Sequence, residues 1–260
     1  MNNNNLYILP QDFVNELCIE IGDTLLIASN VEQLAWNCMQ SGVVFDFNCL
    51  INLLQEKVGQ NGNILFPTYN WDFCKGIAWD YYKTKSKTGS LSQLALKRND
   101  FVRTKHPIYS FAVWGKDADI LYQMNDSNSF AGDTPFHYLC HKEKSKMLTI
   151  DVNLTNCFTF VHYVEEVDNV PYRFLKNFTA PYIDENHNES TRTYSMYVRY
   201  LDRTVITDFT GLEKNLLEQG KMILQNIAGV IVRTLRFDDV FEMVDKDIRN
   251  GIYHNIVRLD

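Results

Sequence analysis

The sequence of 260 residues predicts a single α/β domain spanning residues 1–260, with an antiparallel addition in its C-terminal third. Short apolar segments alternate with helical segments up to about residue 170, an order that favours a parallel sheet with helices between its strands. Residues 192–198 and 205–209 then alternate between polar and apolar, as antiparallel strands do. No linker and no internal repeat divides the chain, so the pattern indicates one domain.

The first elements have clear local signals. Residues 10–20 predict a short helix, and residues 21–29 (IGDTLLIAS) predict a turn that runs into an apolar strand. Residues 46–58 have the apolar spacing of an amphipathic helix, with Asp46 in the capping position. Residues 64–69 (ILFPTY) predict a second buried strand. Helix, strand, helix and strand in this order indicate a parallel sheet.

The remaining elements are less regular. Five of them follow in the order helix, strand, helix, strand and helix, at residues 90–99, 111–115, 116–124, 147–152 and 159–167. Residues 184–190 (DENHNES) are typical of a turn. Residues 212–227 predict a helix, residues 231–236 a strand and residues 240–250 a final helix.

Composition and charge exclude several classes of protein. No apolar run approaches the roughly 20 residues that span a bilayer, and the N-terminal sequence lacks the basic start of a signal peptide. The six cysteines form no CxxC pair, which predicts small buried side chains in a reducing compartment. The net charge of −7 disfavours nucleic acid as a partner. We therefore expect a soluble, cytoplasmic protein that binds neither nucleic acid nor membrane.

Basic residues are concentrated in one segment. Residues 75–105 contain eight lysines and arginines against two aspartates, a local charge of +6 that leaves −13 for the rest of the chain. Such a segment is either an ordinary solvated face or a site for a phosphorylated ligand.

One helical segment carries a candidate catalytic pair. In TFVHYVEE, residues 159–166, Thr159, His162 and Glu165 lie three residues apart and share one face of a helix. A carboxylate in that position can accept a hydrogen bond from one ring nitrogen and raise the basicity of the other. The same spacing also arises by chance in helices that have no catalytic role. HExxH is absent, so the segment does not indicate a zinc protease.

Two other segments indicate turns in the first instance. Residues 106–111 (HPIYSF) are typical of an extended loop that leads into a strand. In residues 131–136 (AGDTPF), Thr134 can cap a helix whose first residue is Pro135, and the start of such a helix also offers N–H groups to an anion. His137 and His141 could share a metal, but no third ligand is near them in the sequence, so no metal site is predicted.

Six segments follow one another along the chain: GDTLLIAS, ILFPTYNW, TKSKTGSLSQLALKR, HPIYSFAVWG, FAGDTPF and TFVHYVEE. Their order and spacing, from about residue 12 to residue 175, resemble the aminoglycoside 3-N-acetyltransferase family. The remainder of the chain matches that family only in its general pattern. The resemblance implies a central mixed sheet flanked by helices, a fold different from that of the GNAT acetyltransferases.

The resemblance also implies an acyltransferase that uses acetyl-CoA as donor and the amine of a sugar-like small molecule as acceptor, with no metal. His162 corresponds to the catalytic base and Glu165 to the partner that orients it. The positions that match the CoA site or its walls are Ser29, Pro67, Thr68, Thr88, Gly89, His106 and Ser110. Substrate contacts are expected from Asp133, Thr134 and Thr159. The basic segment 75–105 would meet the phosphates of CoA.

Departures from the family pattern bear on the acceptor. Ala28 stands where the family usually has His, Asn30 breaks the usual continuation, and Phe158 replaces a small polar residue. These changes favour a biosynthetic amino sugar, nucleotide-linked and destined for a surface polysaccharide. Its cationic or aromatic contacts could come from Arg173, Arg192, Arg199 and the tyrosine-rich residues 194–200. The alternative acceptor is an aminoglycoside antibiotic, as in resistance enzymes. A second alternative is a catalytically inactive CoA- or sugar-binding protein.

Overall fold

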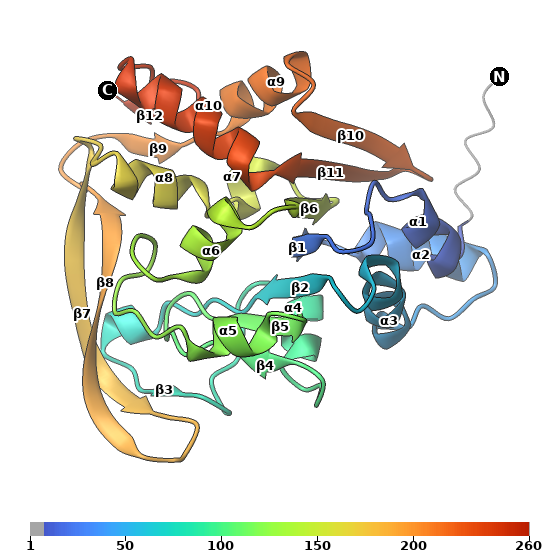
Figure 1. Ribbon diagram of the computed structural model, residues 1–260, viewed down its shortest axis with the longest axis horizontal. Coiled ribbons are helices and arrows are strands. Elements are labelled where there is room, and N and C mark those ends of the chain that lie inside the picture. Colours follow the sequence, from blue (N-terminus) through green and yellow to red (C-terminus); the bar gives the residue numbers. More distant parts are fainter. Residues whose placement is uncertain (1–7, 260) are drawn as a thin grey trace.

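A seven-stranded mixed sheet forms the centre of the protein in the computed structural model, which describes residues 8–259 (Figure 1). The remaining residues of the predicted domain 1–260 lie outside the described part. The strands run in the order β10-β11-β6-β1-β2-β5-β4. Their bounds are β1 Thr24–Ser29, β2 Asn63–Pro67, β4 Val102–Arg103, β5 Phe111–Gly115, β6 Ser145–Ile150, β10 Met222–Ile227 and β11 Val230–Arg236. β1 is parallel to both of its neighbours, β2 and β6, whereas the outer pairs are antiparallel.

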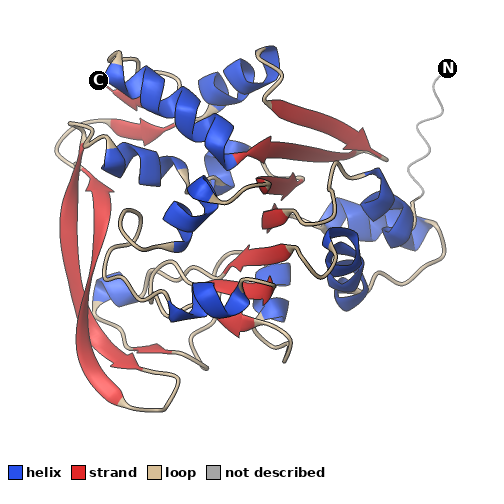
Figure 2. Ribbon diagram, in the orientation of Figure 1, coloured by secondary structure: helices blue, strands red, loops and turns tan. Residues whose placement is uncertain are grey.

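Helices cover both faces of this sheet (Figures 1 and 2). One face carries α1 Pro10–Glu16, α2 Glu32–Gln40, α3 Phe47–Val58 and α4 Ser90–Ala95. The other carries α5 Ala118–Gln123, α6 Pro135–His141, α7 Leu154–Cys157, α8 Val161–Val167, α9 Thr210–Glu218 and α10 Phe237–Arg249. The predicted α/β fold with a mixed sheet between helices is thereby confirmed.

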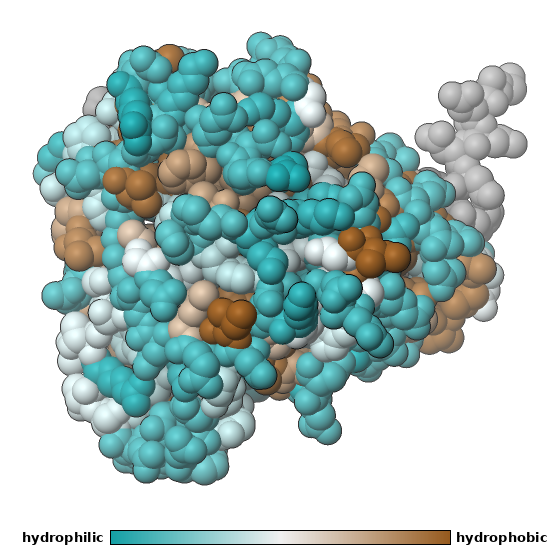
Figure 3. Space-filling view, in the orientation of Figure 1, coloured by the Kyte–Doolittle hydropathy of each residue, from teal (hydrophilic) through white to brown (hydrophobic). Residues whose placement is uncertain are grey.

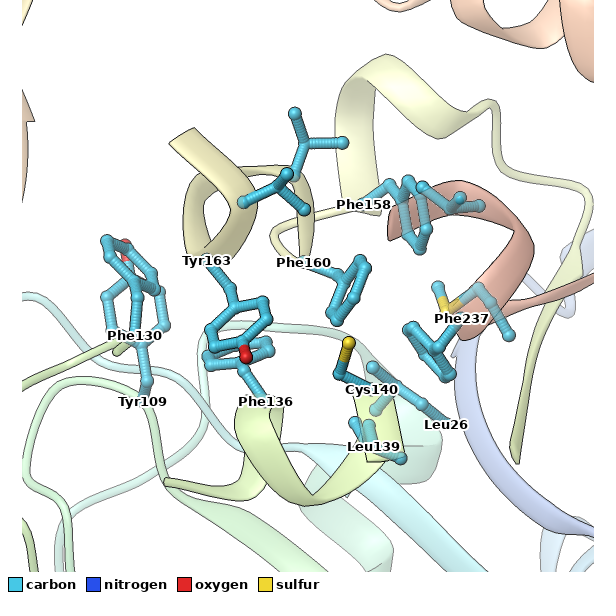
Figure 4. Packing of buried hydrophobic residues seen from close by; sticks show 14 of the residues in the cluster. Leu26, Tyr109, Phe130, Phe136, Leu139, Cys140, Phe158, Phe160, Tyr163 and Phe237 are labelled. Atoms are coloured by element: carbon cyan, nitrogen blue, oxygen red, sulfur yellow. The ribbon is translucent and has the colours of Figure 1, made fainter. Parts of the chain in front are cut away.

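The central strand β1 explains why there are two cores. Successive side chains of a strand point to opposite faces, so Leu25 and Ile27 pack with α1–α4, whereas Leu26 and Ala28 pack with the helices of the other face. All four are buried, as in a parallel strand covered on both sides. Figure 4 shows part of the second core, where aromatic rings from α6, α8 and α10 meet the sheet.

The antiparallel addition is a long hairpin of β7 (Arg173–Ile183) and β8 (Glu189–Arg199), which runs along one side of the molecule (Figure 1). Asp184 closes its turn by accepting hydrogen bonds from the backbone N–H groups of Asn186 and Asn188, as the polar segment predicted. The short strand β3 (Trp79–Asp80) pairs with the far end of β7. A further pair, β9 (Val205–Thr207) and β12 (Val257–Leu259), lies apart from the hairpin.

The helix predicted over residues 212–227 is correct only in its first part. Only its first part forms α9, which ends at Glu218, and residues 222–227 form the strand β10 instead. Gly220 follows the helix with a φ of 67°, a left-handed conformation that typically ends helices. Ala228 and Gly229, both with positive φ, then turn the chain back into β11.

Other differences are smaller. Helix α2 has no counterpart in the predicted elements, because Val31 at its start provides no capping side chain. All six cysteines are free, as expected, but only Cys38 and Cys140 are buried and Cys49 is exposed. No helix among the described residues combines the length and apolar content needed to cross a membrane. The face shown in Figure 3 is mainly hydrophilic, with scattered apolar areas.

Helix α3 offers a matched test of the first core. Asp46 caps it by accepting from the N–H of Asn48, as predicted, and Leu54 is fully buried beside the less buried Leu53. We expect Leu54→Ala to lower the free energy of unfolding by about 2–5 kcal/mol because it leaves a cavity. Leu53→Ala deletes the same atoms and should cost about 1 kcal/mol. Urea denaturation of both variants measures the difference, and equal losses would contradict this packing.

Candidate active site

Helix α8 brings His162 and Glu165 into direct contact. They lie three residues apart on one face of the helix, and the distance from His162 Nδ1 to Glu165 Oε2 is 2.6 Å. The backbone N–H of His162 bonds to the carbonyl of Thr159, which fixes the start of the helix. The structure therefore places the two predicted catalytic residues as a hydrogen-bonded pair.

Glu165 is sealed from solvent and has two further partners. Its side chain is 1% exposed. The Tyr172 hydroxyl donates to Oε1 at 3.0 Å, and Arg173 Nε lies 2.8 Å from Oε2. Arg173 is the first residue of β7 and is itself buried, so the prediction that it contacts a nucleotide-linked acceptor is wrong. Neither partner could be found from helical periodicity, because both lie beyond the end of α8.

The contacts set the charge states of the pair. Burial alone would raise the pKa of the Glu165 carboxyl, but His162, Arg173 and Tyr172 outweigh it and lower that pKa below its usual value. Burial lowers the pKa of His162 and Arg173 lowers it further, against the opposing effect of Glu165. Glu165 is therefore a carboxylate and His162 a neutral imidazole at neutral pH. With Glu165 as acceptor, the ring proton is assigned to Nδ1.

The second ring nitrogen of His162 is open. The Nε2 atom makes no hydrogen bond within the described residues, and the side chain keeps 19% of its surface exposed. The rings of Phe130 and Phe209 lie nearby, with centroids 5.6 Å and 6.5 Å from that of the imidazole. A neutral nitrogen with a free lone pair, in largely apolar surroundings, can accept a proton from a bound molecule.

A pocket of about 310 Å³ begins one helical turn away from His162. It lies at the carboxyl ends of the parallel strands β1 and β2, where open α/β sheets usually bind ligands. Five predicted residues line it together: Ser29, Pro67, Thr88, Gly89 and Thr159. Ala28, a departure from the family pattern, and Lys87 of the basic segment also line it, together with five residues that were not predicted: Tyr69, Trp71, Val152, Asn156 and Cys157.

The floor of this pocket is built by the turn that precedes α4. The Thr88 hydroxyl bonds to the carbonyl of Pro67 and accepts from the backbone N–H of Tyr69, which ties the turn to the end of β2. Gly89 has a φ of 100°, which residues with side chains rarely adopt. A Cβ atom at this position would lie 3.4 Å from the carbonyl oxygen of Ser29. The Thr-Gly sequence therefore keeps the pocket open.

Three of the residues expected at the CoA site do not line the pocket. Thr68 and Ser110 are fully buried, and their hydroxyl oxygens lie 2.8 Å apart. His106 is also buried, and its Nδ1 accepts from the backbone N–H groups of Ile108 and Tyr109. Burial lowers the pKa of His106 to about 3, so it is neutral. These side chains stabilise the turns of the fold instead of facing a ligand.

Asp133 and Thr134, expected to contact substrate, belong to a loop on the other side of His162. Thr134 caps α6 by accepting from the N–H of His137, as predicted, whereas Asp133 is exposed. Asn128 of the same loop donates to Glu166 Oε1 at 2.6 Å, which fastens the loop to α8. The loop thereby holds Phe130 against His162, but neither predicted residue reaches the pocket that Thr159 lines.

The basic segment 75–105 is largely neutralised within the fold. Carboxylates lie within 4 Å of five of its eight cations: Lys75, Lys83, Lys87, Arg98 and Lys105. Arg103 is buried and donates to the carbonyls of Tyr81 and Thr84. Lys87 is the member of the segment that lines the pocket. The segment therefore offers a bound phosphate much less charge than its composition indicates.

Two residues that depart from the family pattern, Phe158 and Ala28, lie in different environments. Phe158 is fully buried, with its ring centroid 5.9 Å from that of Phe160 and 6.0 Å from that of Phe237 (Figure 4). It fills the core and does not face an acceptor. Ala28, by contrast, lines the pocket. Within residues 8–259, no three His, Cys, Asp or Glu side chains are grouped closely enough to hold a metal ion.

Comparison with solved structures finds the same fold in several acetyltransferases. AAC(3)-Xa superposes with a TM-score of 0.76 at 16% identity, over 94% of this chain and 92% of that one. AAC-IIIb, solved as a binary complex with CoASH, gives a TM-score of 0.74 at 13% identity, over 94% of this chain and 97% of that one.

Sequence comparison gives the same result. The prophage-derived aminoglycoside N(3')-acetyltransferase-like protein YokD of Bacillus subtilis is 23% identical over 193 residues, which are 65% of this chain and 67% of that protein. The family model described as aminoglycoside 3-N-acetyltransferase matches residues 26–248, well over half of the chain. The chain therefore belongs to the aminoglycoside 3-N-acetyltransferase family, whose members are acyltransferases that use acetyl-CoA as the acetyl donor.

Proposed function

We propose that this protein transfers the acetyl group of acetyl-CoA to an amine of an aminoglycoside, with His162 as general base and Glu165 as the residue that orients it. The observation that carries the proposal is the His162–Glu165 pair, because Thr159, three residues before His162, lines a pocket at the carboxyl ends of β1 and β2. Membership of the family supports the reaction type.

The pocket has the chemistry that the pantetheine arm of acetyl-CoA requires. Pro67, Tyr69 and Trp71 provide apolar surface, while Ser29 and Thr159 provide hydroxyl groups for its amides. Thr159 lies one helical turn before His162, so the pocket leads toward the base. We assign the donor to this pocket, with Lys87 as the cation nearest to it.

The reaction is a direct transfer between two bound substrates. The amine nitrogen attacks the thioester carbonyl, and Nε2 of His162 accepts the proton that the nitrogen loses. Glu165 stabilises the imidazolium that forms, because Nδ1–H already donates to its carboxylate. The C–S bond then breaks, and the sulfur of CoA leaves with a proton as the free thiol. No acyl-enzyme is needed.

Three findings favour an aminoglycoside over a nucleotide-linked amino sugar. The matching family is described by aminoglycoside acetylation. Arg173 is paired with Glu165, and Phe158 packs in the core, so neither supports a nucleotide-linked acceptor. The net charge of −7 also attracts a polycation and repels a sugar nucleotide.

The catalytic pair is tested by two substitutions. His162→Ala should lower kcat by about 10²–10⁴-fold, because no other group near the pocket replaces the base. Glu165→Gln should also lower kcat, since the neutral amide no longer stabilises the imidazolium. Both variants should bind acetyl-CoA as the wild type does in calorimetry. His141→Ala, an exposed histidine of α6, is the control and should keep full activity. Near-normal kcat in His162→Ala would refute the base assignment.

The donor pocket is tested at Gly89. Gly89→Ala forces a side chain onto a backbone with φ of 100° beside Ser29, so KM for acetyl-CoA should rise about tenfold. Gly76→Ala is the matched control, because Gly76 has a φ of 78°, has open space around its Cβ direction and lies outside the pocket. The left-handed backbone of Gly76 (φ 78°, ψ 10°) tolerates a side chain better than that of Gly89 (φ 100°, ψ 169°), so this variant should carry a milder strain, with KM unchanged. Equal KM changes in both variants would exclude the pocket as the donor site.

The acceptor is identified by thiol release from acetyl-CoA across a panel of aminoglycosides and amino-sugar nucleotides. We expect release with aminoglycosides alone. Thiol release with sugar nucleotides alone would show that the acceptor is a biosynthetic amino sugar. CoA binding without thiol release in the presence of any acceptor would indicate a binding protein.

A further inference from the structure

Arg173 is a buried cation with one acidic partner. Its side chain is 6% exposed, and Glu165 supplies the one carboxylate within 4 Å of its guanidinium among residues 8–259. Its Nη1 donates only a long bond, 3.4 Å, to the carbonyl of Tyr197. A buried guanidinium is costly unless it is well paired, so a position of this kind calls for an explanation.

The geometry connects Arg173 to the reacting histidine through a single atom. Arg173 Nε and His162 Nδ1 lie 2.8 Å and 2.6 Å from the same oxygen, Oε2 of Glu165. The other oxygen, Oε1, accepts from Tyr172. The negative charge of Glu165, which would stabilise a proton on His162, is therefore offset by the permanent positive charge of Arg173.

We propose that Arg173 is a positioning residue of the proposed reaction: it fixes the Glu165 carboxylate and keeps His162 in the unprotonated form that can accept a proton from the acceptor amine. The inference rests on the proposed function. A salt bridge that only joined α8 to β7 would hold the two elements together but would not control the protonation of His162.

The charge balance gives the direction of the effect. A carboxylate beside a histidine raises the pKa of that histidine, so a His–Glu pair alone would be partly protonated near neutral pH. With Arg173 the buried group carries no net charge before it takes up a proton and one positive charge afterwards. Without Arg173 the same step neutralises a buried negative charge and is more favourable. The pKa of His162 is accordingly lowered by burial first and by Arg173 second, against Glu165.

The other titratable groups around the pair do not supply this positive charge. Tyr172 precedes β7 and Tyr197 lies on β8, and burial raises the pKa of both hydroxyls, which keeps them neutral. Tyr253 packs on the Tyr172 ring. Glu166, also on α8, is occupied by Asn128 and by the backbone N–H of Ala131. Arg173 thus supplies the permanent positive charge beside Glu165.

The first test is the pH dependence of kcat/KM. In Arg173→Gln the acid limb should move to higher pH by roughly one unit, so activity should fall more at pH 6 than at pH 8, and the extra loss should approach tenfold at pH values well below the wild-type limb. Arg173→Lys should restore the position of the limb even if kcat stays low. Lys176→Gln removes an exposed cation from the same strand and should leave the limb unmoved. A uniform loss at every pH in Arg173→Gln would reduce Arg173 to a structural role.

A second test does not depend on turnover. Histidine labelled with ¹³C at Cε1 allows the titration of His162 to be followed by NMR, with the signal assigned from its loss in His162→Gln. The midpoint should rise in Arg173→Gln. It should return toward the wild-type value in the double variant Glu165→Gln/Arg173→Gln, which removes both buried charges. If the single variant does not fold, the double variant is compared with Glu165→Gln, in which Arg173 is left without its carboxylate, and its midpoint should be the higher of the two. An unchanged midpoint on removal of Arg173 in either comparison would overturn the inference.

The two tests separate failure of this inference from failure of the proposed function. If the wild type acetylates no acceptor, the proposed function fails, while the NMR titration still reports whether Arg173 controls protonation of His162. If acetylation is found and the midpoint does not move, the inference fails alone.

Discussion

The buried carboxylate of Glu165 is the constraint on which the arrangement of this site depends. A carboxylate that is 1% exposed needs partners for its charge, and here they come from three places: the hydrogen bonds of His162 one turn earlier and Tyr172 after the helix, and the ion pair with Arg173 at the start of β7. Each partner in turn fixes a larger element. His162 is held in one tautomer, α8 is joined to the hairpin, and the hairpin is held against the body of the domain. Replacing this one side chain would therefore disturb chemistry and architecture together.

The sheet supplies the second half of the site by a different principle. Because β1 is buried on both faces, most of its side chains pack in the two cores, and ligand contacts fall to the last residues of the strands and to those that follow them. Ser29 ends β1 and Pro67 ends β2, so the pocket forms where the parallel strands stop. The turn at Gly89, whose positive φ few other residues adopt, completes the pocket. A rigid scaffold and a few terminal residues thus replace a dedicated binding loop.

The sequence predicted the parts of the fold whose signals are local. Asp46 and Thr134 cap helices where expected, because a capping side chain bonds to backbone only two or three residues away. Helix α2, which starts without a capping side chain, and strand β10, which follows a helical pattern past Gly220, had no such signal. For the site, the order of motifs placed His162, Glu165 and the pocket residues. It could not show that Thr68, Ser110 and His106 are buried, or that Arg173 pairs with Glu165. Burial and contacts between distant elements depend on the tertiary fold, and local spacing does not reveal them.

The long hairpin gives this enzyme an assembly order. Arg173 begins β7, while Tyr182 near its other end stacks on Trp79 with ring centroids 4.8 Å apart, so the strand is anchored both beside the catalytic pair and against a segment about a hundred residues earlier. Such distant pairings form slowly, because the chain between them must first be brought into place. Until the hairpin docks, Glu165 lacks its counter-charge, and the pair cannot take up its final protonation state. With His162 as the proposed base, activity depends on these long-range contacts, and a chain whose hairpin has opened would keep the motifs of the family without the charge balance of the site.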